Sequence, residues 1–266
     1  MATRTRTRRQ VHLVEGRPWK DALISFLEPR SPYQPWVKRS TITKGDIVIA
    51  ALDTNPQTIL TSARIGADGD VQSALASVDR KQTRGLMEDW ELQFGNFYQD
   101  HKPGRLMPST ARYCLNAIST GILDGYKDRM GHGTAVEARV LLESGGFCTG
   151  CDMRLPLDQD DARDAVHIRT VDDDETAVGT SLAPDWPAVL CTPCYTAMVR
   201  VEFDTFLAYR FARNGRCPRC AARRTFTIVH EMLNDHDFQN LPPWQVAMGT
   251  GVTDVQWFCG ECHHQW

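Results

Sequence analysis

The chain has 266 residues, a formal net charge of −3 at pH 7 and 42% hydrophobic residues. This composition excludes general disorder, and the length leaves room for two or three small domains. The longest purely apolar run, at residues 47–52, is too short to span a bilayer, and no apolar stretch follows the basic N-terminus. We therefore expect a cytoplasmic protein with no membrane partner.

Residues 13–108 are expected to form a mixed α/β domain behind a basic tail at 1–12. The runs at 47–52 and 58–65 flank the turn sequence DTNPQ and predict a β-hairpin. The KGD sequence at the start of this region resembles PUA-like and EVE-like modules, and that resemblance implies a reader of modified bases.

Two helices are predicted after this domain. Ser109 can cap a helix through the sequence ARYCLNAISTGIL, in which Cys114 falls on the apolar face. Cys114 is therefore predicted to be a buried thiol and not a metal ligand. A second helix at 134–143 leads to a glycine pair before Cys148, and we expect both helices to pack around the first metal site.

Eight of the nine cysteines form four CxxC pairs. These pairs are Cys148/Cys151, Cys191/Cys194, Cys217/Cys220 and Cys259/Cys262. In a chain without a secretion signal disulfides are disfavoured, and the two-residue spacing lets two thiolates face one tetrahedral Zn²⁺ at Zn–S distances of about 2.3 Å. A redox-active CxxC normally occurs singly beside a βαβ unit. The four pairs therefore predict two structural zinc sites.

The segment between the second and third pairs indicates how the pairs combine. From Tyr195 to Arg216 apolar residues recur at three-to-four spacing without a proline, which predicts one helix. At about 1.5 Å per residue, a helix of roughly twenty residues separates its ends by about 30 Å. The pairs at its two ends cannot share an ion, so we assign the first two pairs to one zinc and the last two to the other.

The region around the first zinc resembles the zinc-stapled HNH, or ββα-metal, endonucleases. The residues that carry the resemblance are VHI at 166–168 and DWPAVLCTPCY at 185–195, which correspond to DHI and NLxxLCxxCH in the family. The resemblance implies that His167 is the general base that activates water. It also implies that Mg²⁺ or Mn²⁺ assists hydrolysis of a phosphodiester.

Three positions depart from the family pattern. Val166 stands where the family has a metal carboxylate, Trp186 where it has an asparagine, and Tyr195 where it has a final histidine. Asp185 can supply a ligand if the loop register shifts by one residue, which makes it the second candidate catalytic residue. The acidic run at 172–175 is either a further source of ligands or a solvated turn. The alternative to catalysis is a degenerate scaffold in which the strand histidine is partly buried.

Residues 216–266 predict a small β module. The CPRC start, Trp257 two residues before Cys259, and the final Trp266 resemble the zinc ribbons of transcription-elongation and RNA-polymerase-associated proteins. A module of this size depends on its metal for much of its folding energy. Such ribbons bind DNA, RNA or proteins, so the resemblance leaves a protein partner open.

Arginines crowd the zinc region and predict a nucleic-acid-binding surface in spite of the negative net charge. The candidates are Arg200, Arg210, Arg213, Arg219, Arg223 and Arg224. The alternative is a solvated charged face without a ligand.

We therefore expect an α+β protein with an N-terminal domain, an HNH-like zinc domain at 109–215 and a zinc ribbon at 216–266. The first functional hypothesis is an HNH-type DNA endonuclease that acts on modified or foreign DNA. The alternatives are a non-catalytic, zinc-dependent nucleic-acid-binding protein and a protein-interaction module associated with transcription. A homodimer is left open.

Overall fold

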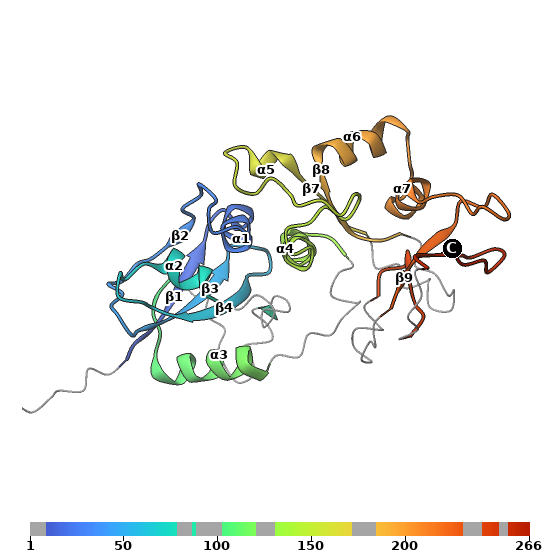
Figure 1. The fold of residues 1–266 in the computed structure, drawn as a ribbon. Coiled ribbons are helices and arrows are strands. Elements are labelled where there is room, and N and C mark those ends of the chain that lie inside the picture. Colours follow the sequence, from blue (N-terminus) through green and yellow to red (C-terminus); the bar gives the residue numbers. More distant parts are fainter. Residues whose placement is uncertain are drawn as a thin grey trace, which may run out of the picture. The chain divides into compact units, whose positions relative to one another are not determined.

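The computed structural model divides into two compact units (Figure 1). The first unit comprises Met1–Leu123, Gly133–Phe147 and Arg154–Val166, and the second comprises Asp124–His132, Cys148–Met153 and His167–Trp266. The residues that the structure describes are 9–78, 87–88, 103–120, 131–171, 185–230, 241–249 and 255–266. The acidic run at 172–175 lies outside them. The domain boundaries expected from the sequence stay a prediction.

The first unit is built on a mixed β-sheet with the strand order β2-β1-β3-β4-β5, in which β6 also pairs with β1. The strands are β1 (Val11–Gly16), β2 (Trp36–Val37), β3 (Ile47–Leu52), β4 (Thr58–Arg64), β5 (Met87–Glu88) and β6 (Gly104–Arg105). β1 and β3 are parallel, whereas β3 and β4 are antiparallel, which confirms the predicted hairpin. β3 is a continuous apolar run because both of its faces are covered.

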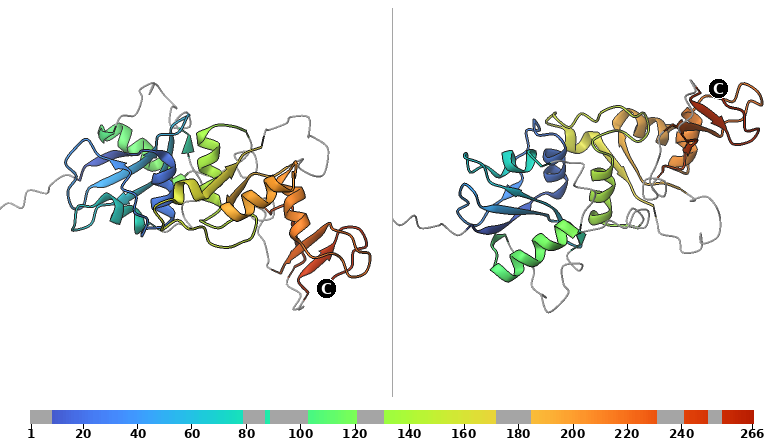
Figure 2. Two further views of the ribbon diagram at one scale, coloured as in Figure 1. Left: turned by 90° about the horizontal axis from the view of Figure 1, so that it is seen from above. Right: turned by 60° about the horizontal axis from the view of Figure 1, so that its bottom comes forward.

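Helices α1 (Trp19–Leu27) and α3 (Pro108–Thr120) cover opposite faces of this sheet (Figure 2). α1 comes so close that a Cβ atom at Gly16 would lie 2.3 Å from Cβ of Ala22, so this position requires glycine. α3 packs Cys114, which is 3% exposed, into a core cluster on the other face. The buried thiol is confirmed, but the expectation that α3 packs around a zinc site was wrong.

The remaining helices of the first unit are α2 (Val71–Ala76), α4 (Thr134–Glu143) and α5 (Ala162–Ala165). α4 has the predicted bounds, but it contacts α1 and belongs to the first unit. α5 also contacts α1, where the Arg163 guanidinium pairs with the Asp21 carboxylate. α1 is therefore buried along most of its length between neighbouring elements.

The described part of the second unit contains a two-stranded sheet, two helices and a three-stranded sheet of order β10-β9-β11. Its elements are β7 (Val166–Arg169, whose first residue belongs to the first unit), β8 (Ala188–Cys191), α6 (Thr192–Arg200), α7 (Phe206–Arg213), β9 (Thr225–Val229), β10 (Gln245–Ala247) and β11 (Trp257–Cys259). The single helix predicted at 195–216 was wrong. α6 ends before Glu202, which has a positive φ of 54°, and Thr205 then caps α7 by accepting a hydrogen bond from the Ala208 amide at 3.1 Å.

Aromatic rings form the centre of the second unit. The Trp244 ring meets Phe206 at a centroid distance of 5.5 Å and Trp186 at 6.2 Å, both edge to face. All three side chains are buried. This contact joins the segment before β10 to α7 and to the segment before β8.

Helices and strands both contribute to the fold, as expected for the α+β class. Across the described part of the chain, no helix combines the length and the apolar character needed to cross a membrane.

Candidate metal centres and nucleic-acid interface

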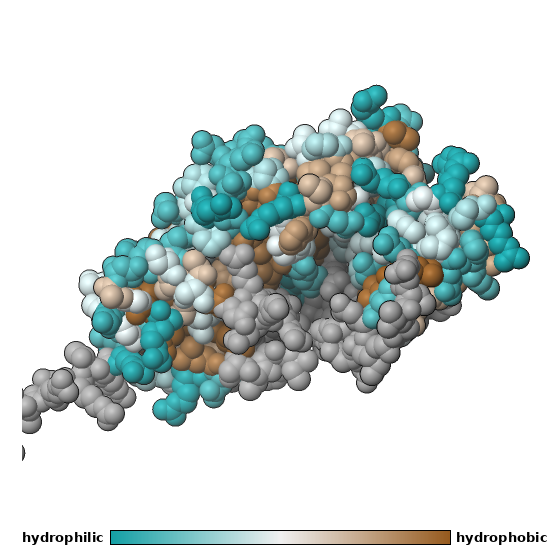
Figure 3. Space-filling model, viewed as in Figure 1, coloured by the Kyte–Doolittle hydropathy of each residue, from teal (hydrophilic) through white to brown (hydrophobic). Residues whose placement is uncertain are grey.

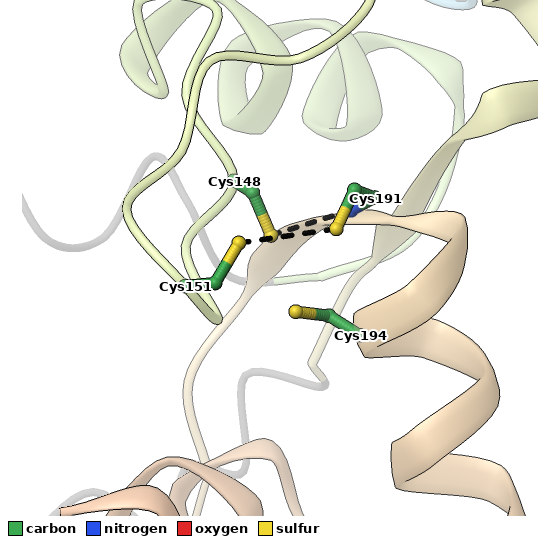
Figure 4. Close-up of side chains that lie close together, drawn as sticks. All are labelled: Cys148, Cys151, Cys191 and Cys194. Carbon is green, nitrogen blue, oxygen red and sulfur yellow. Dashed lines mark hydrogen bonds between the residues drawn. The ribbon is translucent and has the colours of Figure 1, made fainter.

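The first cysteine cluster joins two segments that lie forty residues apart in the chain. Cys148 and Cys151 come from the turn after α4, Cys191 ends β8, and Cys194 lies in the first turn of α6. Their sulfur atoms point toward one another (Figure 4) and all lie within 4.8 Å. The Sγ atoms of Cys151 and Cys191 are 3.9 Å apart, close to the separation of about 3.8 Å that tetrahedral Zn–S bonds of about 2.3 Å require.

The second cluster brings the two ends of the C-terminal sheet together. Cys217 and Cys220 precede β9, whereas Cys259 ends β11 and Cys262 follows it. The Sγ–Sγ distances are 3.6 Å for Cys217–Cys262 and 3.5 Å for Cys220–Cys259. The predicted pairing of the four CxxC motifs is therefore confirmed. Both donor sets consist of four thiols at a spacing that suits a structural zinc ion.

Hydrogen bonds from backbone amides lower the pKa of individual thiols in both clusters. The amide of Cys262 points at the Sγ atom of Cys259 at 3.5 Å and lowers the pKa of this thiol to about 7. Burial raises the pKa of Cys148, but hydrogen bonds from the amides around it, beginning with that of Cys191 at 3.3 Å, leave it lowered overall. Burial raises the pKa of Cys194 to about 12. Because zinc binds thiolates, metal binding must release protons from the cluster.

Helix α7 braces the first cluster from outside the ligand set. Arg210 donates to the carbonyl oxygen of Gly150 at 2.9 Å and to the Asp152 carboxylate at 2.8 Å, which fixes the turn that carries the first two cysteines. Arg213 lies 3.9 Å from the Sγ atom of Cys194. Positive charge at this distance offsets the negative charge of four zinc-bound thiolates.

Tyr209 completes this support and was not found from the sequence. Its hydroxyl accepts a hydrogen bond from Arg213 at 3.0 Å, and its ring lies beside Gly150. A Cβ atom at Gly150 would lie 3.1 Å from Leu190 and 3.2 Å from both Cys194 and Tyr209, so the turn needs a residue without a side chain. The four-residue spacing of Tyr209 and Arg213, which places both on one face of a helix, was a signal for this role in the sequence.

His167 lies on β7 beside the first turn of α6. Its ring stacks on Tyr195 with a centroid distance of 4.1 Å and an interplanar angle of 4°. Its Nε2 atom lies 3.2 Å from the hydroxyl of Thr192. Tyr195 is 43% exposed, so the stacked pair presents a polar aromatic surface at the start of the helix.

Asp185 is buried and both of its oxygens are engaged. Oδ2 accepts hydrogen bonds from Arg169, the shorter at 2.7 Å, and Oδ1 accepts from the amides of Trp186 at 2.8 Å and Leu207 at 3.2 Å. These bonds tie the segment before β8 to β7 and to the start of α7. The carboxylate therefore has a structural task in this conformation, and its expected role in catalysis stays a prediction.

The described residues hold no third group of metal ligands. Clusters of three or more His, Cys, Asp or Glu side chains within this part of the chain are the two cysteine sets alone. The Mg²⁺ or Mn²⁺ site implied by the HNH resemblance is therefore not formed by His167 and Asp185 with a described neighbour. The acidic run at 172–175, the other predicted source of ligands, lies outside the described residues.

The six candidate arginines differ in their surroundings. Arg210 is 8% exposed, bonded to the cysteine turn and covered by the Trp244 ring at 5.5 Å from its centroid. Arg224 is half-buried and lies over the rings of Phe211 and Phe226. The other four are exposed; they are Arg200, Arg213, Arg219 and Arg223. The visible surface around α6 mixes apolar and hydrophilic residues (Figure 3), and Val199 of this helix is 57% exposed.

Comparisons with known proteins do not identify a family for this chain. No family model, no curated protein and no solved structure matches it. Its function must therefore be inferred from the residues themselves.

Proposed function

We propose that this protein binds nucleic acid through a non-catalytic platform held together by two structural zinc ions. The observation that carries the proposal is the set of exposed arginines beside the two cysteine clusters. Arg200, Arg219 and Arg223 make no ion pair with any described residue, so their charge is available to phosphate groups. By contrast, Arg169 and Arg210 are neutralised by Asp185 and Asp152.

The order of elements in the second unit supports a nucleic-acid-binding scaffold. Strands β7 and β8 pair and are followed by α6, with a cysteine cluster closing the turn, which is the order of a zinc-stapled HNH unit. The sheet in which β9 pairs with β10 and β11 carries its own cysteine cluster, which supports a module similar to a zinc ribbon, although β10 runs parallel to β9. We propose these two identities for the two modules.

The surroundings of His167 favour binding over cleavage. Tyr195 stacks on this imidazole at the position where the HNH family has a metal-binding histidine. A phenol is a poor ligand for Mg²⁺, which prefers carboxylates and water. A half-exposed aromatic pair at a helix start is instead suited to stacking on a base.

The test is a titration of double-stranded and single-stranded DNA with zinc-loaded protein at several salt concentrations. We expect the Arg219→Gln/Arg223→Gln double variant to bind more weakly for every sequence and to lower the salt slope by about two, because each lost phosphate contact removes about one released counterion. The matched control is Arg64→Gln, an exposed arginine of β4 in the first unit. Equal losses in both variants, or no DNA binding at physiological salt, would exclude the proposed surface.

The second candidate function is HNH-type cleavage of DNA, and the one observation in its support is that His167 lies on the strand position expected of the general base. The imidazole lies on the strand before the helix, and Nε2 is close to a hydroxyl that can orient it. The test is nicking of supercoiled plasmid, modified and unmodified, with Mg²⁺, Mn²⁺ or EDTA. Metal-dependent nicking that is lost in His167→Ala but kept in His132→Ala, an exposed histidine of the same unit, would establish cleavage. Binding of DNA without any cleavage product would support the non-catalytic platform.

A further inference from the structure

The first unit contains an open cavity of about 310 Å³ that lies away from both cysteine clusters in the sequence. The start of β1, strand β6 and the first turns of α3 surround it. Val11, Leu106 and Leu115 form an apolar floor, since each is partly buried and packs against the core cluster that contains Cys114. The cavity therefore lies against a buried apolar cluster of this unit.

Three arginines from three separate segments line the same cavity. Arg9 precedes β1, Arg105 ends β6 and Arg112 lies in α3. All three are exposed, and within the described residues none of them forms an ion pair. Among the described residues that line the cavity, none is acidic. Three like charges around one small space repel each other unless an anion lies between them.

We propose that this cavity binds a nucleotide, with its phosphate on the arginines and its sugar and base over the apolar floor. Guanidinium groups match phosphate oxygens with paired hydrogen bonds, which makes arginine the usual residue for this ligand. The volume lies at the lower end of the range for small-molecule sites, about 300–1,000 Å³. The nucleotide is either free in solution or one unit of a nucleic-acid strand, because both present the same chemistry.

This inference does not depend on the proposed function of the second unit. Every described residue that lines the cavity belongs to the first unit. A free mononucleotide can therefore bind whether or not the zinc platform binds DNA, and failure of one proposal leaves the other intact.

The test is calorimetric titration of the full-length, zinc-loaded protein with adenosine monophosphate, adenosine and inorganic phosphate. We expect the monophosphate to bind more tightly than either of its parts. Arg105→Gln and Arg112→Gln should each weaken it by about 10-fold to 100-fold, the range for hydrogen bonds to a charged group. Arg64→Gln, which removes an exposed arginine that does not line the cavity, should leave it unchanged.

A further variant, Leu115→Trp, tests the apolar floor of the cavity. It should weaken the monophosphate more than inorganic phosphate, with thermal unfolding used to verify the fold. To separate the two sources of nucleotide, short oligonucleotides are titrated into the Arg219→Gln/Arg223→Gln background. Tighter binding of the oligonucleotide than of the monophosphate, reduced by Arg105→Gln, would support the site and assign it to a strand.

Three results would overturn the proposal. The first is no binding of monophosphate or oligonucleotide in that background at millimolar concentration. The second is equal binding of adenosine, or of inorganic phosphate, and the monophosphate. The third is an equal effect of Arg64→Gln and Arg105→Gln, which would mean attraction by overall charge without a defined site.

Discussion

The two units are stabilised by different means. In the first unit a sheet lies between helices, and residues such as Leu23, Ile49 and Leu52 are fully buried. In the second unit, the strands are short and the two ends of each module meet at a cysteine cluster. Burial of apolar surface can therefore stabilise the first unit, whereas we expect the second to depend on metal bonds that close its modules.

Removal of zinc should have the largest effect, and it should affect the stability of the two units differently. Chelation should unfold the second unit and leave the first folded, because structural zinc contributes about 10–16 kcal/mol of apparent binding energy to small modules. Hydrogen exchange should show loss of protection in β9, β11 and α6 and retention in β1 and β3. Addition of zinc should restore it. Simultaneous loss of protection in both units would contradict the contrast.

A substitution in the core of the first unit should have the opposite selectivity. Ile49→Ala removes a fully buried side chain of β3 and should lower the free energy of unfolding of that unit by about 2–5 kcal/mol. Thermal unfolding with and without chelator measures the effect, which should be the same in both. Val37→Ala, at an exposed residue of β2, is the control and should change stability by less than about 0.5 kcal/mol.

Loss of the Arg210 contacts that support the first cluster should have a smaller effect, confined to the second unit. Arg210→Gln removes the charged donor to Gly150 and Asp152 and should lower stability by about 2 kcal/mol. Zinc should also leave this cluster faster, as followed by a chromophoric chelator. Arg216→Gln changes the same charge at an exposed position and should release zinc at the wild-type rate. Equal rates of zinc release in the two variants would show that Arg210 does not support the cluster.

The smallest expected effect is a pH dependence of the first unit. Burial acts to raise the pKa of Asp46, but hydrogen bonds from the amides of Gln10 and Thr43 outweigh it and the pKa is lowered. A lowered pKa in the folded state means stability that is present above the unfolded value of about 3.9 and is lost as the pH falls through the folded value. Asp46→Asn should therefore cost about 1 kcal/mol at pH 7 and flatten the acid limb of the stability curve. An unchanged acid limb would contradict this.

The cysteine pairing was predicted correctly from a premise that was partly wrong. One helix from Tyr195 to Arg216 was expected to hold the second and third pairs apart, but the chain forms two helices with a turn at Glu202. The pairing survives because α7 still lies between the clusters in the chain. The turn was missed because the apolar spacing continues through it, although Thr205 is a helix-capping residue.

The contacts that a side chain makes with distant parts of the chain could not be predicted from the sequence. Cys114 was correctly predicted to be buried, but its core is that of the N-terminal sheet. The stack of Tyr195 on His167 requires a strand and a helix to meet, and no local sequence pattern predicts this contact. The four hydrogen-bond donors around Asp185 likewise come from three parts of the chain.

The two cysteine clusters could be predicted from the sequence, because the CxxC spacing places two thiolates on one ion through local backbone geometry. The same holds for the hairpin of β3 and β4, whose turn residues are adjacent in the chain. Which arginines stay exposed to a ligand depends instead on long-range packing. A guanidinium can be buried against a carbonyl oxygen and an indole, as Arg210 is, or stay exposed, as Arg219 does. That outcome depends on residues far away in the chain, such as Gly150 and Trp244.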